Sequence, residues 1–131
     1  MISAIVPTIG RIDSLNALLE SLAVQTCRVD EVVVASADPE TCDFINSKWN
    51  STKLVVRCVA VSPPNAVRQR MAAIEIARGE RLLLLDDDVV LERDCVQQML
   101  ATLESNDGAS AGVAAVTADF NNQTWPDPTR I

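Results

Sequence analysis

The sequence predicts a three-layer α/β/α fold with a mostly parallel sheet. Strand-like and helix-like segments alternate from one end of the chain to the other, which is the pattern of parallel strands joined by right-handed helical crossovers. The valine run at 32–34 lacks polar alternation, as expected for a parallel strand covered on both faces. With 131 residues, 48% of them hydrophobic and 22% charged, the chain is long enough for one globular domain with a real core.

The first part of the chain is expected to form three strands and two helices. Leucines at helical spacing, Leu15, Leu18, Leu19 and Leu22, indicate the first helix. Asp13 is a candidate N-cap for it, and Pro39 suits the first turn of the second helix. The expected elements are strands over 3–8, 30–36 and 53–61 and helices over 11–26 and 38–49.

The second part of the chain is expected to continue the alternation. Val67, Met71 and Ile74 are expected on one face of the next helix, and Gly79 is expected to end it. The four leucines at 82–85 are expected to form a central strand buried on both faces. The expected elements are a helix over 65–78, a strand over 80–86, a helix marked by Val96, Met99, Leu100 and Leu103, and a strand over 111–118. The domain would therefore span 1–118, with an irregular tail over 119–131.

Charge and hydropathy disfavour two classes of partner. The net charge is −7 and the basic residues are scattered, which disfavours nucleic-acid binding through phosphate neutralisation. No apolar run approaches the roughly 20 residues that cross a bilayer, so we expect no transmembrane segment.

Cysteine and histidine usage bears on location and mechanism. Cys27, Cys42, Cys58 and Cys95 are widely spaced without a C-x-x-C pair. With no secretion signal in the sequence, we expect free thiols in a reducing cytoplasm. The chain has no histidine and no tyrosine. A general base would therefore have to be a carboxylate, a lysine or a thiol, and a Ser-His-Asp or Cys-His mechanism within this chain is excluded.

Unusual residues follow the predicted strands, where parallel α/β sheets bind their ligands. These residues are Pro7 and Thr8, the segments 36–38 and 63–65, and the aspartates at 86–88. Because the carboxyl ends of parallel strands share one edge of the sheet, we expect these segments to form the ligand site.

The aspartate run is the strongest candidate for chemistry. Residues i and i+2 of an extended segment point to the same side, so we expect Asp86 and Asp88 to face one ligand while Asp87 turns away. Two carboxylates with open positions for water and phosphate oxygens suit Mg²⁺ or Mn²⁺. The alternative is a solvated acidic turn in which Asp88 or Asp94 caps the next helix.

Arginines near the same strand ends are candidates for contacts with an anion. Arg11 follows the first strand, and Arg68 and Arg70 lie on the helix after the "SPPN" turn; each guanidinium could grip a phosphate as a planar fork. The alternative is a solvated helix face, paired to Glu75. Asp38 could read a base or ribose, or simply cap its helix. The glycines form no phosphate-binding loop. The remaining way for this chain to bind a diphosphate is through a bridging metal ion.

Two long segments resemble family 2 glycosyltransferases with the GT-A fold. The stretch "SAIVPTIGRIDSLNALLESLAVQTCRVDEVVVAS" is similar to the family's first βαβ unit. The stretch "NAVRQRMAAIEIARGERLLLLDDDVVLERD" is similar to its helix, its A-x-GE turn and the strand that leads into a D-x-D motif. The resemblance spans about Ser3 to Thr117 and implies a Rossmann-like nucleotide-binding half-domain. It also implies transfer of a sugar from a UDP-, GDP- or dTDP-linked donor, usually with inversion and a divalent metal.

The resemblance assigns roles by position. Asp88 looks like the metal-contacting aspartate and Asp86 the first member of the motif, with Asp87 near ribose or metal-bound water. The nucleotide-sugar site would comprise Pro7, Thr8, Arg11, Ser36, Asp38, Asn65, Arg70, Asp86 and Asp87, and the Mn²⁺ or Mg²⁺ site Asp86 and Asp88.

The chain departs from the family pattern in three ways. Where the family usually has an aspartate that reads the base, this chain has Ser36, or Asp38 shifted by two residues. Gly10 stands where many members place an aromatic residue. The acceptor-binding half, which carries the catalytic base, is expected to lie beyond these residues. The acceptor would be a sugar or lipid-linked glycan, and an apolar face left open by the missing half could drive self-association into a homo-oligomer.

Other functional classes remain open. A non-catalytic nucleotide-binding or assembly module would keep the same fold. A signalling receiver domain needs a lysine after a late strand, and the only lysines are Lys48 and Lys53. A sugar-nucleotide pyrophosphorylase uses a glycine-rich first loop, whereas "PTIGRIDS" holds one glycine.

Overall fold

The computed structural model describes residues 1–105 and residue 112, and it confirms the α/β fold. Its elements are β1 (Ile2–Thr8), α1 (Ile12–Ala23), β2 (Glu31–Ser36), α2 (Pro39–Lys48), β3 (Val56–Ala60), α3 (Ala66–Ile76), β4 (Arg81–Leu84) and α4 (Cys95–Ser105). The strand predicted over 111–118, the tail over 119–131 and the domain boundary between them lie outside the described residues.

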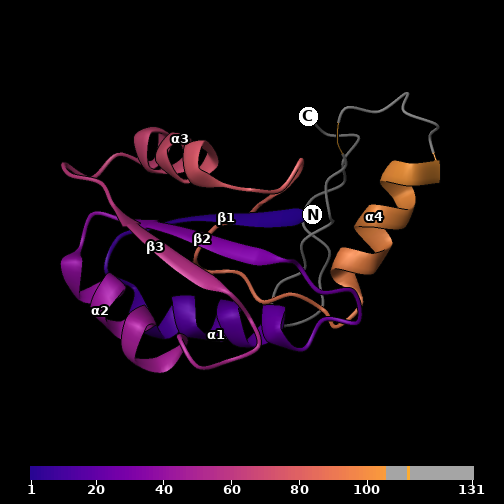
Figure 1. The fold of residues 1–131 in the computed structure, drawn as a ribbon, viewed down its shortest axis with the longest axis horizontal. Coiled ribbons are helices and arrows are strands. Elements are labelled where there is room, and N and C mark those ends of the chain that lie inside the picture. The colour runs from indigo at the N-terminus through magenta and orange to yellow at the C-terminus, as the bar shows by residue number, and fades with distance from the viewer. Residues whose placement is uncertain (106–111, 113–131) are drawn as a thin grey trace, which may run out of the picture.

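The described strands form one parallel sheet in the order β3-β2-β1-β4. Helices α1 and α2 cover one face and α3 covers the other (Figure 1). The chain builds outward from β1 to β3 and then returns through α3 to place β4 on the opposite side of β1. The strand order therefore changes direction beside β1, which is where open α/β sheets bind ligands.

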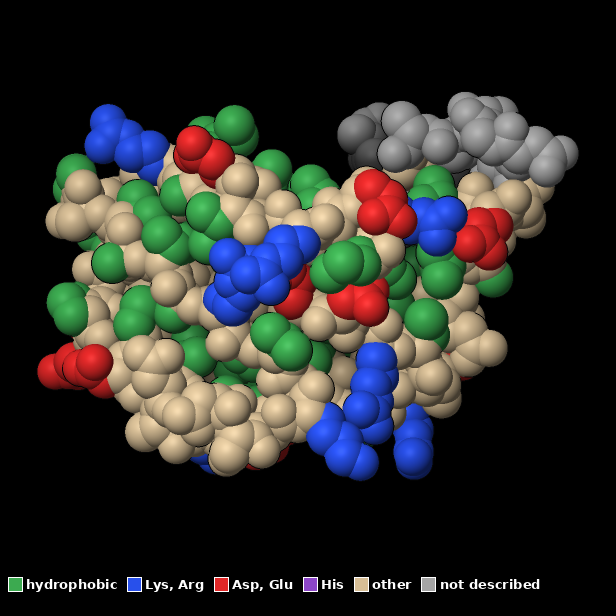
Figure 2. Space-filling model, viewed as in Figure 1, with side chains coloured by type: hydrophobic (Ala, Val, Ile, Leu, Met, Phe, Trp, Pro, Cys, Tyr) green, Lys and Arg blue, Asp and Glu red, His purple; other side chains and the backbone are tan. Residues whose placement is uncertain are grey.

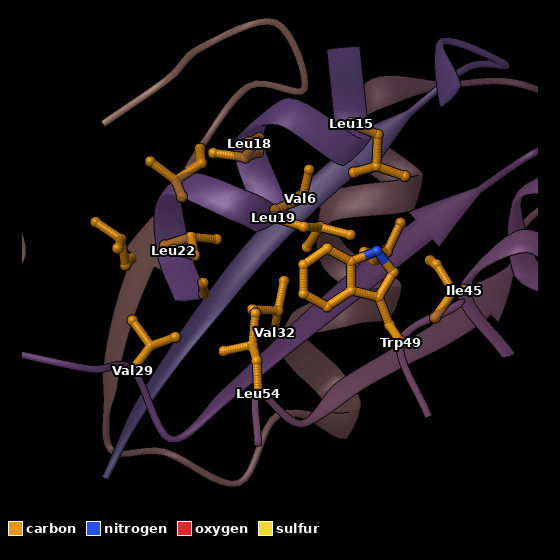
Figure 3. Close-up of a cluster of buried hydrophobic side chains, with 14 of the residues drawn as sticks. Val6, Leu15, Leu18, Leu19, Leu22, Val29, Val32, Ile45, Trp49 and Leu54 are labelled. Carbon is orange, nitrogen blue, oxygen red and sulfur yellow. The ribbon is translucent and has the colours of Figure 1, made fainter. Parts of the chain in front are cut away.

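The main core lies between α1, α2 and the sheet. All four leucines at helical spacing on α1 are fully buried. They pack with Val6 and Val32 of the sheet and with Trp49 after α2 (Figure 3). The indole Nε1 of Trp49 donates a hydrogen bond to Asn16 Oδ1 at 3.2 Å. A smaller cluster under α3 contains Ile5, Val33, Ala35 and Ala73, because alternate residues of each strand face opposite layers.

Two of the predicted helix ends differ in the structure. Arg11 rather than Asp13 occupies the N-cap of α1, and Asp13 lies in the first turn, where a negative charge favours the helix dipole. Gly79 does not end α3, because the helix stops at Ile76 and Ala77 is extended. Gly79 is instead needed for packing, because a Cβ there would lie 2.7 Å from Ser3 Oγ.

The other helix starts follow ordinary capping rules. Asp38 caps α2 by accepting a hydrogen bond from the Glu40 amide at 3.1 Å, and Pro39 lies in the first turn as predicted. Asn65 caps α3 by accepting from the Arg68 amide at 3.0 Å. Both caps place a polar residue at the carboxyl edge of the sheet.

The prediction that the leucine run forms a central strand was wrong for the described sheet. β4 is an edge strand there, and Leu82 and Leu84 are 42% and 53% exposed. Only Leu83 and Leu85 face the main core. The physical reason is that α3 packs over β1 and β2 and leaves this side of β4 open among the described residues.

The prediction that Val67, Met71 and Ile74 form the apolar face of α3 was also wrong. Val67 and Met71 are 69% and 60% exposed, whereas Gln69 and Ala73 are fully buried. Only Ile74 of the predicted face packs against the smaller cluster. The helix lies close to the sheet through an alanine and a glutamine instead of through large apolar side chains.

The expectation of four free thiols was wrong for one pair. Cys42 of α2 and Cys58 of β3 form a disulfide with a Cα–Cα distance of 5.4 Å. The cause is that α2 packs against β3, which brings together residues 16 apart in sequence. Cys27 and Cys95 are free. Burial, followed by the charges of Asp94 and Glu92, raises the pKa of the Cys95 thiol.

A buried ion pair joins three strands at the amino end of the sheet. The carboxylate of Glu31, 2% exposed, accepts hydrogen bonds from Ser3 Oγ at 2.7 Å and the Arg78 amide at 2.6 Å. Arg57 of β3 donates to its other oxygen at 2.8 Å. This Glu31 cluster ties the turn before β4 to β1, β2 and β3, at the edge of the sheet opposite the predicted site.

The surface agrees with the charge pattern of the sequence. On the face drawn in Figure 2, lysine and arginine side chains form several separate groups with hydrophobic side chains scattered among them. Within the part of the chain that the structure describes, every helix is too short or too polar to span a bilayer.

Candidate functional site

A cavity of about 260 Å³ opens at the carboxyl ends of β1 and β4, beside the start of α3. Its lining comprises Pro7, Thr8, Ile9, Arg11, Ala66, Gln69, Arg70, Asp86, Asp87 and Asp88. It therefore brings together seven of the residues predicted to bind nucleotide or metal, from three separate segments of the chain: the end of β1 and the loop after it, the start of α3, and the loop after β4. The structure leaves Ser36, Asp38 and Asn65 outside this lining.

The three aspartates have different environments. Asp87 is 5% exposed and accepts a hydrogen bond from Thr8 Oγ1 at 2.7 Å. The side chains of Asp86 and Asp88 are 72% and 57% exposed. Asp87 and Asp88 lie in a turn and not in an extended segment, and Asp87 lines the cavity together with Asp86 and Asp88 instead of turning away from it. The middle carboxylate anchors the segment to β1, and the outer two are exposed.

Two arginines lie beside these carboxylates. Arg70 Nη2 lies 3.5 Å from Asp86 Oδ1, and Arg11 Nη1 lies 3.7 Å from Asp88 Oδ2. Arg11 Nε also lies 3.7 Å from Asp87 Oδ2. The repulsion among three adjacent negative charges is thus offset by two guanidinium groups. All three distances exceed those of good hydrogen bonds, so each pair is weak, at about 0–1 kcal/mol.

Arg70 has an unused donor inside the cavity wall. Its Nε is buried and has no hydrogen-bond partner among the described residues. A buried unpaired donor costs about 1–3 kcal/mol. The Nη2 of Arg70, in contrast, lies 3.5 Å from the cavity residue Asp86, and a guanidinium offers the planar fork that a phosphate requires.

The donor set at this edge fits a hard divalent cation only in part. Asp86 and Asp88 supply exposed carboxylate oxygens, the ligand type that Mg²⁺ and Mn²⁺ prefer. No group of three or more carboxylate or thiol side chains is close enough to hold a metal within the described residues. Any cation here would therefore take the remaining ligands from water and substrate, as Mg²⁺ commonly does.

The end of β2 forms a second polar group beside the cavity. Ser36 is fully buried, and its hydroxyl accepts from the Asp38 amide at 3.0 Å and donates to the Asp38 carbonyl at 3.2 Å. Gly10 adopts φ +63°, and a Cβ there would lie 3.3 Å from Asp38 Oδ2. A larger residue at position 10 would therefore crowd Asp38 and strain the backbone, which explains the glycine that departs from the family pattern.

Gln69 is a polar residue of the site that sequence reasoning missed. It lies in the first turns of α3, is fully buried, and donates from Nε2 to the carbonyls of Thr8 at 2.7 Å and Ala35 at 2.8 Å. Its Oε1 accepts from the Asn65 amide at 3.1 Å. The signal available in the sequence was its spacing of four from Ala73, which places both on one helix face.

Comparison with known proteins finds a family model and a relative that match this chain. The model of the family described as glycosyl transferase family 2 matches residues 3–131. An uncharacterized glycosyltransferase of Haemophilus influenzae is 28% identical over 106 residues, which cover 81% of this chain and 35% of that protein.

Solved structures of S. aureus TarS share the fold. TarS 1–349 in complex with UDP superposes with a TM-score of 0.64 at 22% identity, covering 93% of this chain and 43% of that one. The complex with UDP-GlcNAc gives 0.64 at 26% identity, covering 81% and 32%. The chain thus spans well under half the length of each of these relatives.

Proposed function

Because the chain belongs to glycosyl transferase family 2, we propose that it forms the donor-binding part of a glycosyltransferase that uses a nucleotide-diphospho-sugar. The observation that carries this proposal is the cavity at the carboxyl edge of the sheet that Asp86, Asp88 and the side chain of Arg70 line together. The similar TarS structures hold UDP and UDP-GlcNAc. A uridine nucleotide is therefore the first donor to test, ahead of GDP- and dTDP-linked sugars.

Different residues of the cavity would bind different parts of the donor. Arg70 grips the diphosphate, and Arg11 moves from Asp88 to the phosphate or ribose when donor binds. Asp86 and Asp88 would hold Mn²⁺ or Mg²⁺, which, when bound, supplies positive charge for the leaving diphosphate. Asp87 keeps the segment attached to β1 through Thr8. Asp38, at the end of β2, could read the base, whereas Ser36 is fully buried, is bonded to Asp38 and would act through it.

The transfer itself requires groups beyond the described residues. In an inverting reaction, a carboxylate removes a proton from the acceptor hydroxyl, whose oxygen then attacks the anomeric carbon in line with the departing diphosphate. We propose that this base and the site for a sugar or lipid-linked glycan acceptor belong to the portion of the relatives that this chain does not span. A cytoplasmic location stays a prediction that fractionation would test.

The second candidate is a non-catalytic nucleotide-binding or assembly module. The coding sequence downstream discriminates the two, because a donor domain of an enzyme continues into an acceptor-binding half. Sedimentation of the purified chain would test the predicted self-association in either case.

Calorimetry with UDP, GDP, dTDP and UDP-GlcNAc, each with and without Mn²⁺, tests the proposal. We expect metal-dependent binding of at least one nucleotide, and its loss in Asp88→Asn. Asp94→Asn is the matched control, because Asp94 is bonded to Gln98 on α4 and does not line the cavity. A folded sample that binds none of the nucleotides in the presence of Mn²⁺ would contradict the proposal.

A further inference from the structure

Gln69 joins three segments whose ends form the site. Its Nε2 donates to the last carbonyl of β1, at Thr8, and to that of Ala35 in β2. Its Oε1 accepts from the amide of Asn65, which caps α3. A single side chain thus fixes the distance between the ends of the two central strands and the helix that carries Arg70.

The chemistry of this position requires a glutamine-like group. Both amide hydrogens and the amide oxygen are used, so the three bonds need two donors and one acceptor at the end of a two-methylene stem. An aliphatic residue of the same size would leave the two carbonyls without these partners. A glutamate would keep the acceptor but bring a carboxylate against two carbonyl oxygens.

The three segments contribute different parts of the proposed donor site. The ends of β1 and β2 carry Thr8, which holds Asp87, and Ser36, which is bonded to Asp38, the residue proposed to read the base. The start of α3 carries Arg70, on the diphosphate side, and Arg70 follows Gln69 directly in the chain. The register places Thr8 beside Ser36, but no hydrogen bond of the sheet links either strand to α3. Gln69 supplies that link.

We propose that Gln69 is a positioning residue for the nucleotide site, which sets the spacing between its nucleoside side and its diphosphate side. The inference rests on the proposed donor-binding function. Gln69 lines the cavity but is fully buried, and both of its amide hydrogens and its amide oxygen are bonded to Thr8, Ala35 and Asn65, so it acts through these groups.

A second buried glutamine provides a matched control. Gln25 is 4% exposed, and its Nε2 donates to the carbonyls of Ser21 at 3.1 Å and Glu92 at 2.7 Å. Its Oε1 accepts from the Val96 amide at 3.0 Å. Gln25 therefore makes the same three kinds of bond as Gln69, but it joins α1 to the segment before α4 and does not line the cavity.

The experiment compares Gln69→Met with Gln25→Met in the 131-residue chain. The midpoint of thermal unfolding and the dissociation constant of whichever nucleotide the wild type binds with Mn²⁺ are measured for each. We expect both variants to unfold at lower temperature than the wild type. We expect Gln69→Met to raise the dissociation constant about tenfold, and Gln25→Met to change it less than about twofold. Gln69→Glu is the second variant if Gln69→Met does not fold, with the same expected loss.

The outcomes separate this inference from the function on which it rests. Wild-type affinity in a folded Gln69 variant would overturn the positioning role while leaving donor binding intact. Equal losses in the Gln69 and Gln25 variants would also overturn it, because general loosening would then explain both. A wild-type chain that binds no nucleotide would overturn the proposed function itself.

Discussion

Replacing Glu31 by glutamine is expected to lower the free energy of unfolding by about 2–4 kcal/mol without changing nucleotide affinity. The carboxylate accepts three hydrogen bonds, one of them from Arg57. Glutamine keeps one acceptor oxygen and turns the other into a donor that faces a donor. Hydrogen bonds to charged groups contribute about 1.5–3 kcal/mol each, and breaking a buried ion pair costs about 3–5 kcal/mol. Because the Arg57 side chain is 29% exposed, we take the lower part of the combined range.

The control for Glu31→Gln is Glu104→Gln. Glu104 also pairs with an arginine, since Arg81 Nη1 lies 3.1 Å from its Oε1, but their side chains are 55% and 45% exposed. Exposed pairs contribute about 0.2–1 kcal/mol. Urea unfolding followed by circular dichroism at pH 7 measures both variants. Equal losses of stability in the two variants would refute the assignment of Glu31 as a buried anchor of the sheet.

The loss of stability in Glu31→Gln is expected to depend on pH. Burial raises the pKa of Glu31, but hydrogen bonds from the Arg78 amide, Ser3 and Arg57, together with the charge of Arg57, outweigh it and hold the pKa below its ordinary value of 4.5. A lowered pKa stabilises the folded state above the unfolded pKa, and this stabilisation is lost as the pH falls through the folded pKa. The stability difference between wild type and Glu31→Gln should therefore be full at neutral pH and shrink below about pH 4.5.

Three further predictions concern other parts of the molecule. Arg70→Lys should weaken nucleotide binding about tenfold in calorimetry while leaving the unfolding midpoint nearly unchanged, because lysine keeps the charge but loses the fork; an undiminished affinity would contradict a phosphate contact. The double variant Cys42→Ala/Cys58→Ala should lose about 3 kcal/mol of stability, as expected for a loop of this length. Reductant should lower the unfolding midpoint of the wild type but not that of this variant. Gly79→Ala should cost about 1–3 kcal/mol in urea unfolding, because its Cβ would overlap Ser3 Oγ and the Met1 carbonyl.

Much of the fold was predictable because local patterns and packing agree in its first half. The leucines of α1 and the valines of β2 face the core as their spacing predicts. The buried faces of α3 and β4 were harder to predict, because they depend on which strands lie next to each other in the sheet. Apolar periodicity placed Val67 and Met71 inside, whereas the structure buries Gln69. The sequence offers only the spacing of four between Gln69 and Ala73, which does not by itself identify the glutamine as the buried residue at that contact.

The site was predictable in outline and not in detail. The rule that ligands bind at the carboxyl ends of parallel strands led to the edge of the sheet where the structure has a cavity lined by the aspartates at 86–88. The pairing of Asp86 with Arg70 and of Asp88 with Arg11 joins residues 16 and 77 positions apart. The Cys42–Cys58 disulfide depends on the same kind of non-local proximity. Only the three-dimensional arrangement of the elements reveals such pairs.

The position of β4 also bears on when the site is formed. Among the described strands it has the fewest residues and pairs with β1 alone, so its amides should exchange with solvent sooner than those of β1 and β2. The aspartates at 86–88 directly follow this strand, whereas Arg70 lies on helix α3, which Gln69 links to β1 and β2. The aspartates that take part in donor binding would then belong to a segment that opens transiently. Bound nucleotide should slow hydrogen exchange in 81–88 more than in α3, which makes the ordering of that segment part of the binding free energy.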